Sequence, residues 1–198
     1  MIIGLTGSIA TGKSTVSRML KQKGYPIVDA DEISRLVVEP GSPVLTSITE
    51  TFGKEVLLSD GSLNRDKLGN LIFNDKSNRE KLNGIMHPAV RKEMIRQKEE
   101  WLEKGANTVI MDIPLLFESK LQSYVDKIIV VSATPQVQKE RLMARNGYSS
   151  EEAEARINTQ LSIANKEKGA DAVIDNNGTI VDTEIQLNDL LAEWDAII

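Results

Sequence analysis

The chain has 198 residues, with 24 Lys and Arg against 29 Asp and Glu, one His and no Cys. This length is enough for a globular domain whose core needs neither disulfides nor a structural metal. The absence of cysteine excludes a disulfide scaffold, a thiolate zinc site and thiol catalysis. The net charge of −5 argues against a protein that coats nucleic acid, because such affinity comes largely from Lys and Arg neutralising phosphates. We therefore expect no nucleic-acid partner, although a small anion can still bind a local basic site.

The sequence shows no sign of a targeting or membrane segment. The apolar run near the N-terminus, Met1–Gly7, is too short and too early for a signal peptide with a basic leader. No uninterrupted apolar stretch approaches the ~18–20 residues that a helix needs to cross a bilayer. We expect a cytoplasmic protein with no membrane partner, and the sequence predicts no oligomeric state.

Short apolar runs alternate with longer amphipathic stretches along the chain. Continuous Val- and Ile-rich runs without polar alternation suit strands that are buried on both faces of a parallel sheet. The fold class is therefore predicted to be α/β, with a parallel sheet sandwiched by helices. The runs predicted to be strands are Ile2–Thr6, Pro26–Val28, Thr108–Ile113, Lys127–Ser132 and Ala172–Ile174.

Two intervals interrupt the alternation of strands and helices within what we predict to be a single domain, residues 1–198. Residues from about 134 to 169 suggest two helices that meet at the turn signal Asn146-Gly147 and could hinge as a lid. Residues from about 33 to 104 contain no convincing strand and suggest a helical insertion. We expect its helices to break at Pro40-Gly41, Gly53, Asp60-Gly61 and His87-Pro88.

The C-terminal segment, residues 180–198, has the pattern of an amphipathic helix. Its apolar residues stand at mostly helical spacing, so we expect the helix to close one face of the sheet. The residues in this stripe are Ile185, Leu187, Leu190, Leu191 and Trp194.

Residues 7–14 read Gly-Ser-Ile-Ala-Thr-Gly-Lys-Ser and fit the phosphate-binding P-loop pattern, directly after a strand and before a helical pattern. Glycines let the backbone wrap closely around phosphates, so that N–H groups and the positive end of the helix face the anion. Lys13 would place a charge on the β/γ oxygens, and the Ser14 hydroxyl can ligate Mg²⁺. The alternative is an ordinary strand-to-helix turn with a surface lysine. The predicted nucleotide-binding residues here are Gly7, Ala10, Thr11, Gly12, Lys13, Ser14 and Thr15.

Asp112 ends the apolar segment Ile110-Met111-Asp112, as the acid of a Walker B strand does. We interpret it as a Mg²⁺ ligand together with Ser14. The alternative is an Asp that caps the next helix.

Asp29 and Asp31 follow another predicted strand. The two acids stand at i and i+2, and we expect only one of them to enter the site. We choose Asp31, because we expect its strand to lie beside the P-loop strand, and ligands of open α/β sheets lie beyond the carboxyl ends of the strands, where an acid can meet an acceptor hydroxyl. The alternative for Asp31 is an N-cap of a helix over Glu32–Val38.

Two pairs in the predicted lid have helical spacing. Arg141 and Arg145 stand at i and i+4, and Arg156 with Gln160 repeats that spacing on the next helix. Arginines on these faces could fold over a triphosphate and stabilise the charge on the transferring phosphoryl group. A solvated face with Glu partners is the alternative.

His87, the single histidine, precedes Pro88 and is explained by structure, since the residue before proline disfavours the α region. Contact with a substrate is left open. The charged run Arg91–Lys104 is interpreted as a solvated helix face without a chemical role.

Taken together, these segments closely resemble the dephospho-CoA kinase family over nearly the whole chain. The P-loop is shared by many families, whereas the Asp-Ala-Asp, Pro-Leu-Leu-Phe-Glu and Asn-Asn-Gly segments, in this order, are more specific. Ser8 and Ala10 depart from the family, which often has Gly there, and Ala10 adopts positive φ less readily. The matching segments are 4–7, 12–15, 28–31, 38–41, 87–88, 112–118, 141–145 and 174–178.

The resemblance implies transfer of the γ-phosphoryl group of ATP to the ribose 3′-hydroxyl of dephospho-CoA, with Mg²⁺ as cofactor. It implies that Lys13, Asp31 and Arg141 act in catalysis, and that Arg145 and Asn176 bind ATP, Asn176 near the base. It also places residues 39–73 in the region that grips the CoA-like acceptor. Phosphoryl transfer depends mainly on positioning and charge stabilisation, which these residue types can supply.

Two other readings share part of this pattern. Adenylate and shikimate kinases also have a P-loop and a lid, but the acceptor segments here point to dephospho-CoA. A GTPase-like switch would read guanine through Asn-Lys-x-Asp, and the nearest string, residues 165–168, lacks the acid. The Asp-x-x-Gly element of such a switch has a match at residues 175–178. That match follows the last predicted strand rather than a Walker B strand, so we regard it as accidental. A preference for ATP over GTP would separate the kinase from the switch.

Overall fold

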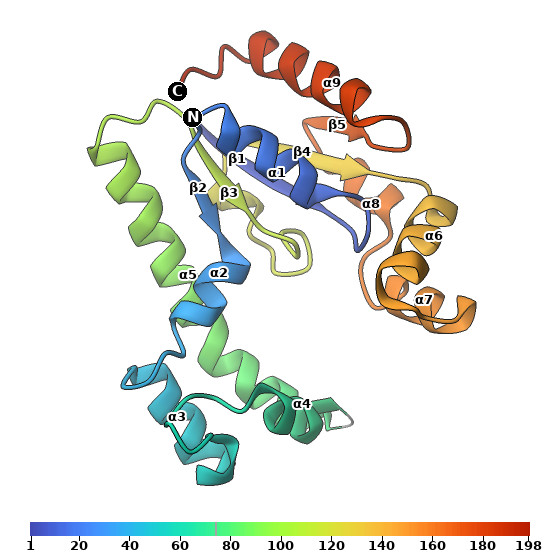
Figure 1. Ribbon diagram of the computed structural model, residues 1–198. Coiled ribbons are helices and arrows are strands. Elements are labelled where there is room, and N and C mark those ends of the chain that lie inside the picture. Colours follow the sequence, from blue (N-terminus) through green and yellow to red (C-terminus); the bar gives the residue numbers. More distant parts are fainter. Residues whose placement is uncertain (74) are drawn as a thin grey trace. The chain divides into compact units, whose positions relative to one another are not determined.

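A computed structural model describes residues 1–73 and 75–198 of the chain, and Asn74, inside the predicted helical insertion, lies outside the described residues (Figure 1). The chain divides into two compact units. The first consists of Met1–Val28 and Lys98–Ile198, and the second of Asp29–Gln97. The phosphate loop belongs to the first unit.

The first unit is built on a five-stranded sheet with the order β2-β3-β1-β4-β5. Strand β1 pairs in parallel with β3 and β4, and β4 pairs in parallel with β5. The predicted α/β class is therefore confirmed, and each predicted strand is present with ends that shift by no more than one residue. The strands are β1 (Ile2–Gly7), β2 (Ile27–Asp29), β3 (Val109–Asp112), β4 (Lys127–Ser132) and β5 (Ala172–Asp175).

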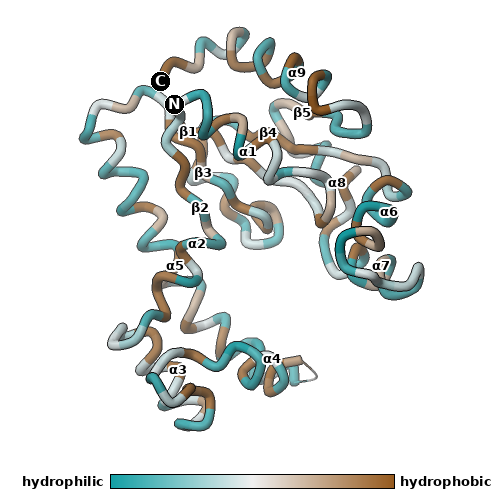
Figure 2. The backbone as a smooth tube through the Cα atoms, viewed as in Figure 1, coloured by the Kyte–Doolittle hydropathy of each residue, from teal (hydrophilic) through white to brown (hydrophobic). Residues whose placement is uncertain are grey.

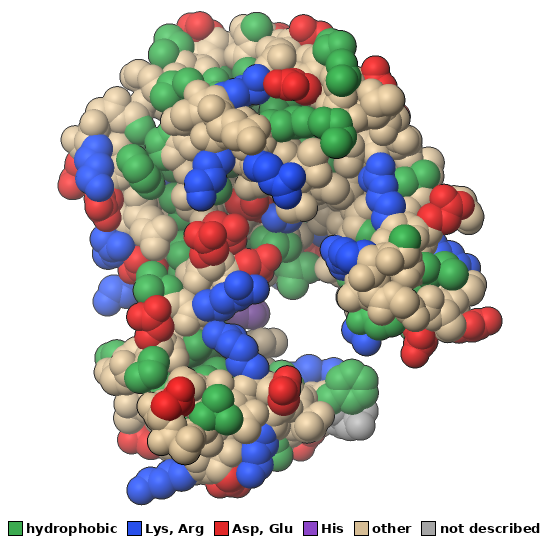
Figure 3. Space-filling view, viewed as in Figure 1, with side chains coloured by type: hydrophobic (Ala, Val, Ile, Leu, Met, Phe, Trp, Pro, Cys, Tyr) green, Lys and Arg blue, Asp and Glu red, His purple; other side chains and the backbone are tan. Residues whose placement is uncertain are grey.

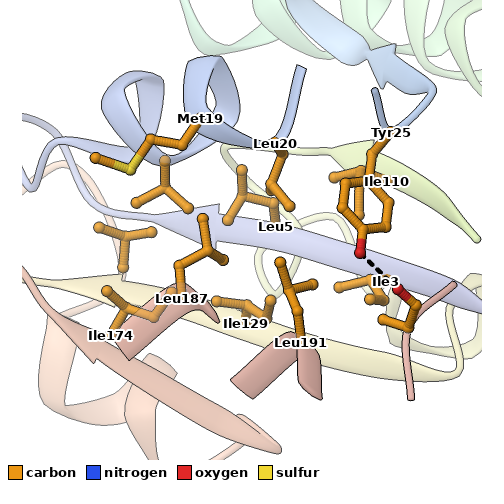
Figure 4. Packing of buried hydrophobic residues seen from close by; sticks show 13 residues of the cluster. Ile3, Leu5, Met19, Leu20, Tyr25, Ile110, Ile129, Ile174, Leu187 and Leu191 are labelled. Atoms are coloured by element: carbon orange, nitrogen blue, oxygen red, sulfur yellow. Dashed lines mark hydrogen bonds between the residues drawn. The ribbon is translucent and has the colours of Figure 1, made fainter. Parts of the chain in front are cut away.

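The main core lies between one face of this sheet and the helices α1 (Lys13–Gln22) and α9 (Ile180–Glu193). Alternate strand residues point into it because successive side chains of a strand point to opposite faces. Figure 4 shows the strand, α1 and α9 side chains packed against one another, and Figure 2 shows the hydrophobic colouring of the central strands. Buried members include Ile3, Leu5, Leu20, Ile110, Ile129, Ile174 and Leu187.

The opposite face of β1 is covered at Gly4 by the segment that follows β3. A Cβ atom at Gly4 would lie 2.7 Å from Leu116 Cδ1 and 3.2 Å from the Val125 methyl groups. Glycine at this position therefore lets Leu116, which is fully buried, approach the strand backbone.

Helix α9 closes one face of the sheet, as predicted, but its buried stripe differs from the expected one. Leu187 and Leu191 are buried, whereas Ile185 is 52% exposed, so its assignment to the stripe is wrong. The residue one turn before Leu187 on the buried face is Thr183. Thr183 is buried, and its hydroxyl donates to Asn176 Oδ1 at 2.7 Å. The buried stripe therefore contains a polar residue with a tertiary hydrogen bond, which a pattern of hydropathy does not predict.

The predicted lid interval holds three helices rather than two: α6 (Pro135–Asn146), α7 (Ser150–Ile157) and α8 (Ile163–Glu167). The predicted turn at Asn146-Gly147 is confirmed, since Gly147 ends α6 in the left-handed region at φ 69°. The third helix arises because Ser162 provides a new N-cap, its side chain accepting from the Asn165 N–H at 3.3 Å.

The second unit is helical, as its sequence predicted. It contains α2 (Ala30–Leu36), α3 (Pro43–Phe52), the 3₁₀ turn η1 (Lys54–Val56), α4 (Arg65–Phe73) and most of α5 (Lys76–Glu103). Its small core is formed by Val38, Ile48, Val56 and Leu68. The breaks predicted at Pro40-Gly41, Gly53 and Asp60-Gly61 are confirmed, because all three lie between helices and their glycines have positive φ.

The break predicted at His87-Pro88 is wrong, because α5 is continuous through Pro88. A proline inside a helix meets the carbonyl of the residue four positions earlier, which here is Gly84. A Cβ at Gly84 would meet nothing within 4 Å, so Gly84 faces open space. Within residues 1–73 and 75–198, no helix combines the length and the apolar character needed to span a membrane.

Candidate active site

The phosphate loop connects β1 directly to α1. Gly7 is the last residue of β1 and Lys13 the first of α1, and Gly12 between them is the N-cap with φ 89°. Ala10 also lies in the left-handed region, with φ 61°. The loop therefore adopts the tight turn predicted for residues 7–14, with N–H groups at the positive end of a helix.

Lys13 and Asp112 form an ion pair across the carboxyl end of the sheet. The Asp112 side chain is 3% exposed and the Lys13 side chain 18% exposed. Asp112 ends β3, and a turn rather than a helix follows it, so its interpretation as a helix cap is wrong. Ser14 and Thr15 lie in the first turn of α1, and the Ser14 side chain is exposed.

Asn176, just after β5, holds the phosphate loop in place. Its Nδ2 donates to the Thr11 carbonyl at 2.7 Å, and its Oδ1 accepts from Thr183 Oγ1 at 2.7 Å. A Cβ atom at Gly12 would collide with the Asn176 amide, so only glycine fits there. The structure thus places the Asn176 side chain against the loop backbone.

Arg141 lies on α6 and also contacts Asn176. Its Nη2 donates to the Asn176 carbonyl at 2.8 Å, whereas its Nη1 is buried and has no hydrogen-bond partner within the described residues. Nη1 lies 3.8 Å from the position that a Cβ of Gly12 would take, which puts it beside the loop. Arg145 lies one turn further along α6, is exposed, and donates to Asn146 Oδ1 at 2.8 Å. Figure 3 shows Lys and Arg side chains over the part of the surface formed by α6 and α7.

The prediction that Arg156 and Gln160 share a helix face is wrong, because α7 ends at Ile157. Arg156 stacks over the Tyr148 ring, 4.4 Å from its centroid. Gln160 instead reaches the phosphate loop, where its Oε1 accepts from the Ile9 N–H at 2.9 Å. No short-range pattern could reveal this contact, because it joins residues 151 positions apart.

Asp29, and not Asp31, is the helix cap. Asp29 ends the strand and caps α2, accepting from the N–H groups of Asp31 at 2.8 Å and Glu32 at 3.1 Å. Asp31 is therefore not an N-cap and not a strand residue, but an exposed residue in the first turn of α2. The expectation that this strand lies beside the P-loop strand is also wrong, because β3 stands between β2 and β1.

His87 lines a pocket of about 360 Å³ on the second unit, together with Pro88, Arg91, Lys92 and Ile95. The pocket carries two cationic side chains, and contact of His87 with a substrate stays a prediction. Much of the charged run that follows is a solvated face with local ion pairs, such as Arg96 with Glu93 and Lys104 with Glu100.

Sequence reasoning missed Lys166 and Glu118 as parts of the site's framework. The Lys166 side chain is fully buried, and its ammonium lies 2.9 Å from the Gly7 carbonyl and 3.0 Å from Glu118 Oε1. In the sequence, residues 165–168 matched only part of a guanine-binding motif. The available signal was the spacing of Lys166 three residues after the buried Ile163 on one short helix.

This arrangement brings the first lysine of α1, a strand-end acid and an arginine with a buried Nη1 to the carboxyl edge of a parallel sheet. Such a site can hold the phosphates of a nucleotide and stabilise charge on a phosphoryl group in transfer. The fold and the site therefore define a P-loop phosphotransferase.

Comparison with known proteins identifies the family within this class. The sequence model of the dephospho-CoA kinase family matches residues 1–182. A dephospho-CoA kinase from Bacillus cereus is 53% identical over 197 residues, which cover 100% of this chain and 98% of that protein. One from Listeria innocua is 55% identical over 185 residues, covering 93% and 92%. The chain belongs to the dephospho-CoA kinase family, and it is accordingly an ATP-dependent kinase of coenzyme A synthesis.

Solved structures agree with this assignment. A crystal structure from Thermus thermophilus aligns with a TM-score of 0.82 at 35% identity, covering 98% of this chain and 97% of that one. A dephospho-CoA kinase from Campylobacter jejuni aligns with a TM-score of 0.75 at 29% identity, covering 98% and 96%. A shikimate kinase from Bacteroides thetaiotaomicron, at 16% identity, covers 98% of each chain with a TM-score of 0.50 and shares the fold alone.

Proposed function

We propose that the residues around the phosphate loop catalyse transfer of the γ-phosphoryl group of ATP to the ribose 3′-hydroxyl of dephospho-CoA, giving coenzyme A and ADP. The observation that carries the proposal is the pairing of Lys13, at the start of α1, with the buried Asp112 at the end of β3. A cation and an acid at this edge are the two charges that a bound magnesium nucleotide requires.

Lys13 acts on the β- and γ-phosphate oxygens. Its ammonium sits on a long flexible side chain and is 18% exposed, so it can leave Asp112 for a phosphate when the nucleotide binds. The N–H groups of Ala10, Gly12, Lys13 and Ser14, in the loop and at the start of α1, complete the anion site. The N–H groups of Thr11 and Thr15 already donate to the Ser8 and Gly12 carbonyls, so we propose that these two residues contact the nucleotide through their side chains.

Asp112 and Ser14 are the proposed protein ligands of Mg²⁺. The described residues contain no cluster of three or more His, Cys, Asp or Glu that could hold a metal alone. Mg²⁺ fits this donor set, because it prefers hard oxygen ligands and is usually bound by one or two carboxylates together with substrate phosphates. When bound, it would neutralise charge on the phosphates.

Arg141 supplies the charge for the transition state. Its guanidinium is held by the Asn176 carbonyl, and its buried Nη1 has a donor to spare beside Gly12. A buried donor without a partner is costly, so a phosphate oxygen is a natural acceptor for it. Arg145, exposed on the same helix, binds the nucleotide from the solvent side, and Asn176 contributes by fixing the loop.

Asp31 orients the acceptor hydroxyl. Of the two acids after β2, Asp29 already accepts two backbone N–H groups, whereas the Asp31 side chain is exposed at the start of α2. The acceptor itself is gripped by residues 39–73, which belong to the second unit.

The test is a coupled ADP-release assay with ATP and a panel of acceptors: dephospho-CoA, adenosine, AMP and shikimate. We expect turnover with dephospho-CoA and little with the others, and chromatography against coenzyme A should identify the 3′-phosphorylated product. The Lys13→Ala variant is the matched control, and it should lose activity by about 10²–10³-fold with its fold intact. Equal turnover of adenosine, or an active Lys13→Ala enzyme, would contradict the proposal.

The proposed metal ligand can be tested by titration. Asp112→Asn removes a formal ligand charge, so the Mg²⁺ concentration for half-maximal rate should rise by about tenfold or more. Initial rates across a Mg²⁺ series check this, with Asp126→Asn as a control substitution at an acid whose carboxylate accepts from the Ile2 N–H at 2.7 Å. Superimposable Mg²⁺ curves for wild type and Asp112→Asn would leave Asp112 with a structural role only.

A further inference from the structure

A buried lysine lies directly behind the phosphate loop. Lys166, on α8, has no exposed side-chain surface. Its Nζ donates to the Gly7 carbonyl at 2.9 Å and to the Pro114 carbonyl at 3.3 Å, and it pairs with Glu118 Oε1 at 3.0 Å. Gly7 opens the phosphate loop, and Pro114 lies two residues after Asp112.

These contacts use all the hydrogen-bonding capacity of the ammonium. A lysine has three N–H donors, and the structure gives this one three oxygen acceptors. No donor is left for a nucleotide, so Lys166 does not act on the phosphates directly. It acts on the backbone that presents the residues which do.

Stability alone gives a weak reason for a charge in this place. A buried ion pair loses hydration on folding, and its replacement by apolar residues of similar volume is often neutral or stabilising. The cation is useful here for another reason, because it joins the carbonyls of two segments that leave neighbouring strands. One segment carries Lys13 and the other carries Asp112.

Neighbouring contacts tie the same loop to the same stretch of chain. Gln160 Oε1 accepts from the Ile9 N–H at 2.9 Å, and the Leu161 carbonyl accepts from Ser8 Oγ at 3.4 Å. Leu161 in turn donates its N–H to Glu118 Oε1 at 3.1 Å. The first half of the phosphate loop therefore rests on residues 160–166, and the ion pair of Lys166 with Glu118 lies at the centre of this support.

We propose that Lys166 is a positioning residue for phosphoryl transfer, whose ammonium holds the Gly7 and Pro114 carbonyls so that Lys13 and Asp112 are kept in register for the nucleotide. The inference rests on the proposed function of those two residues. Because displacement of a reacting group by about 1 Å can cost about 10²-fold in rate, loss of this support is expected to lower kcat.

The test removes the ammonium without leaving an unpaired charge. In Lys166→Met combined with Glu118→Gln, the Leu161 N–H keeps its acceptor and the pair becomes neutral. We expect a folded protein whose Tm is within about 4 °C of wild type, but whose kcat is about 10- to 100-fold lower. In Lys166→Gln combined with Glu118→Gln, an amide N–H can again donate toward the carbonyls, and kcat should recover about threefold or more.

Two controls share most of these changes. Glu118→Gln alone keeps the Lys166 ammonium on both carbonyls, so its loss of kcat should be smaller than that of the Lys166→Met, Glu118→Gln double variant. Lys168→Met makes the same charge change two residues away, at an exposed position, and should leave kcat unchanged. Circular dichroism and thermal melts accompany each kinetic measurement.

The proposal is overturned if the Met variant is folded and turns over like wild type. It is also overturned if that variant does not fold while the controls do, because Lys166 then serves stability, or if the Gln and Met variants are equally slow. Wild-type turnover of dephospho-CoA in the same assay tests the proposed function separately from this inference.

Discussion

Ala10 shows how a single residue can strain the phosphate loop. Its φ of 61° lies in the left-handed region, where a Cβ approaches the following carbonyl. Gly12 reaches φ 89° without that cost, and its missing Cβ leaves room for the Asn176 amide. The sequence could predict where glycine is required by the P-loop pattern, and that Ala10 would be the less suitable residue. It could not predict that Asn176 fills the space over Gly12.

Substitution of Ala10 should reveal this strain. Relief of about 1–2 kcal/mol in the left-handed region outweighs the entropy cost of glycine, about 0.5–1 kcal/mol. Ala10→Gly should therefore leave the free energy of unfolding unchanged or raise it by up to about 1 kcal/mol. Ala10→Val, with a β-branched side chain at the same φ, should lower it by about 2 kcal/mol or more. Urea unfolding measures both, and a marked loss of stability in Ala10→Gly would contradict the account.

Arg141 should act on the transition state rather than on ground-state binding. Arg141→Ala is expected to lower kcat and kcat/KM for ATP by about the same factor, about 10²–10³, with little change in KM. The control is Lys139→Ala on the same helix, whose side chain pairs with Glu154 and has no assigned role. Steady-state kinetics with varied ATP separate the two roles. A rise in KM for ATP with kcat unchanged would show that Arg141 acts only in ground-state binding of the nucleotide.

At the scale of elements, patterns local in sequence predicted well, and contacts between distant residues were what they missed. The five strands were recognisable because β1, β3 and β4 are almost wholly buried and so read as continuous apolar runs. The wrong predictions failed because of contacts that a local pattern does not contain. Thr183 replaces Ile185 in the buried stripe through a bond to Asn176, and Gln160 leaves the helix to meet Ile9.

A buried hydrogen bond attaches the C-terminal segment after α9 to the turn after α1. Tyr25 Oη donates to the Ala196 carbonyl at 2.5 Å, and both residues are buried at the edge of the main core (Figure 4). Tyr25→Phe leaves this carbonyl without its partner, so the free energy of unfolding should fall by about 1–3 kcal/mol, with kcat unchanged. Urea unfolding at neutral pH, together with the kinase assay, checks both statements.

The pH dependence of this effect has a defined sign. Burial raises the pKa of the Tyr25 hydroxyl above its ordinary value of 10.0. The contribution of Tyr25 is thus fully present below pH 10 and is lost as the pH rises through the higher folded-state pKa. The stability difference between wild type and Tyr25→Phe should narrow at alkaline pH. A difference that stays constant or widens above pH 10 would argue against the bond.

At the scale of the whole molecule, the sequence contains the site residues but not the topology that arranges them. Lys13 and Asp112 were predictable because each belongs to a local motif, and their pairing follows from β1 and β3 being neighbours in the sheet. The strand order that separates β2 from β1 was not predictable from local patterns. Lys166 was missed for the same reason, since its acceptors lie 52 and 159 residues away along the chain.

The role of Asp31 can be resolved by comparing two substitutions. A carboxylate is a weak base at neutral pH, and a loose phosphoryl-transfer transition state needs little early removal of the proton. We therefore expect Asp31 to orient the acceptor hydroxyl. Asp31→Asn keeps the size and an acceptor oxygen, so it should retain much more kcat than Asp31→Ala, whereas general-base catalysis predicts similar losses of about 10²–10⁴-fold in both.

Binding measurements complete this test. The dissociation constant for ATP should change little in either Asp31 variant, because the residue acts on the acceptor. Asp29→Asn is the matched control: asparagine caps a helix about as well as aspartate, so α2 should form normally and kcat should stay near wild type. Near wild-type kcat in Asp31→Ala would remove Asp31 from the reaction. A large loss in Asp29→Asn, with α2 intact, would make Asp29 the acid that meets the acceptor, despite the two N–H groups that its carboxylate already binds.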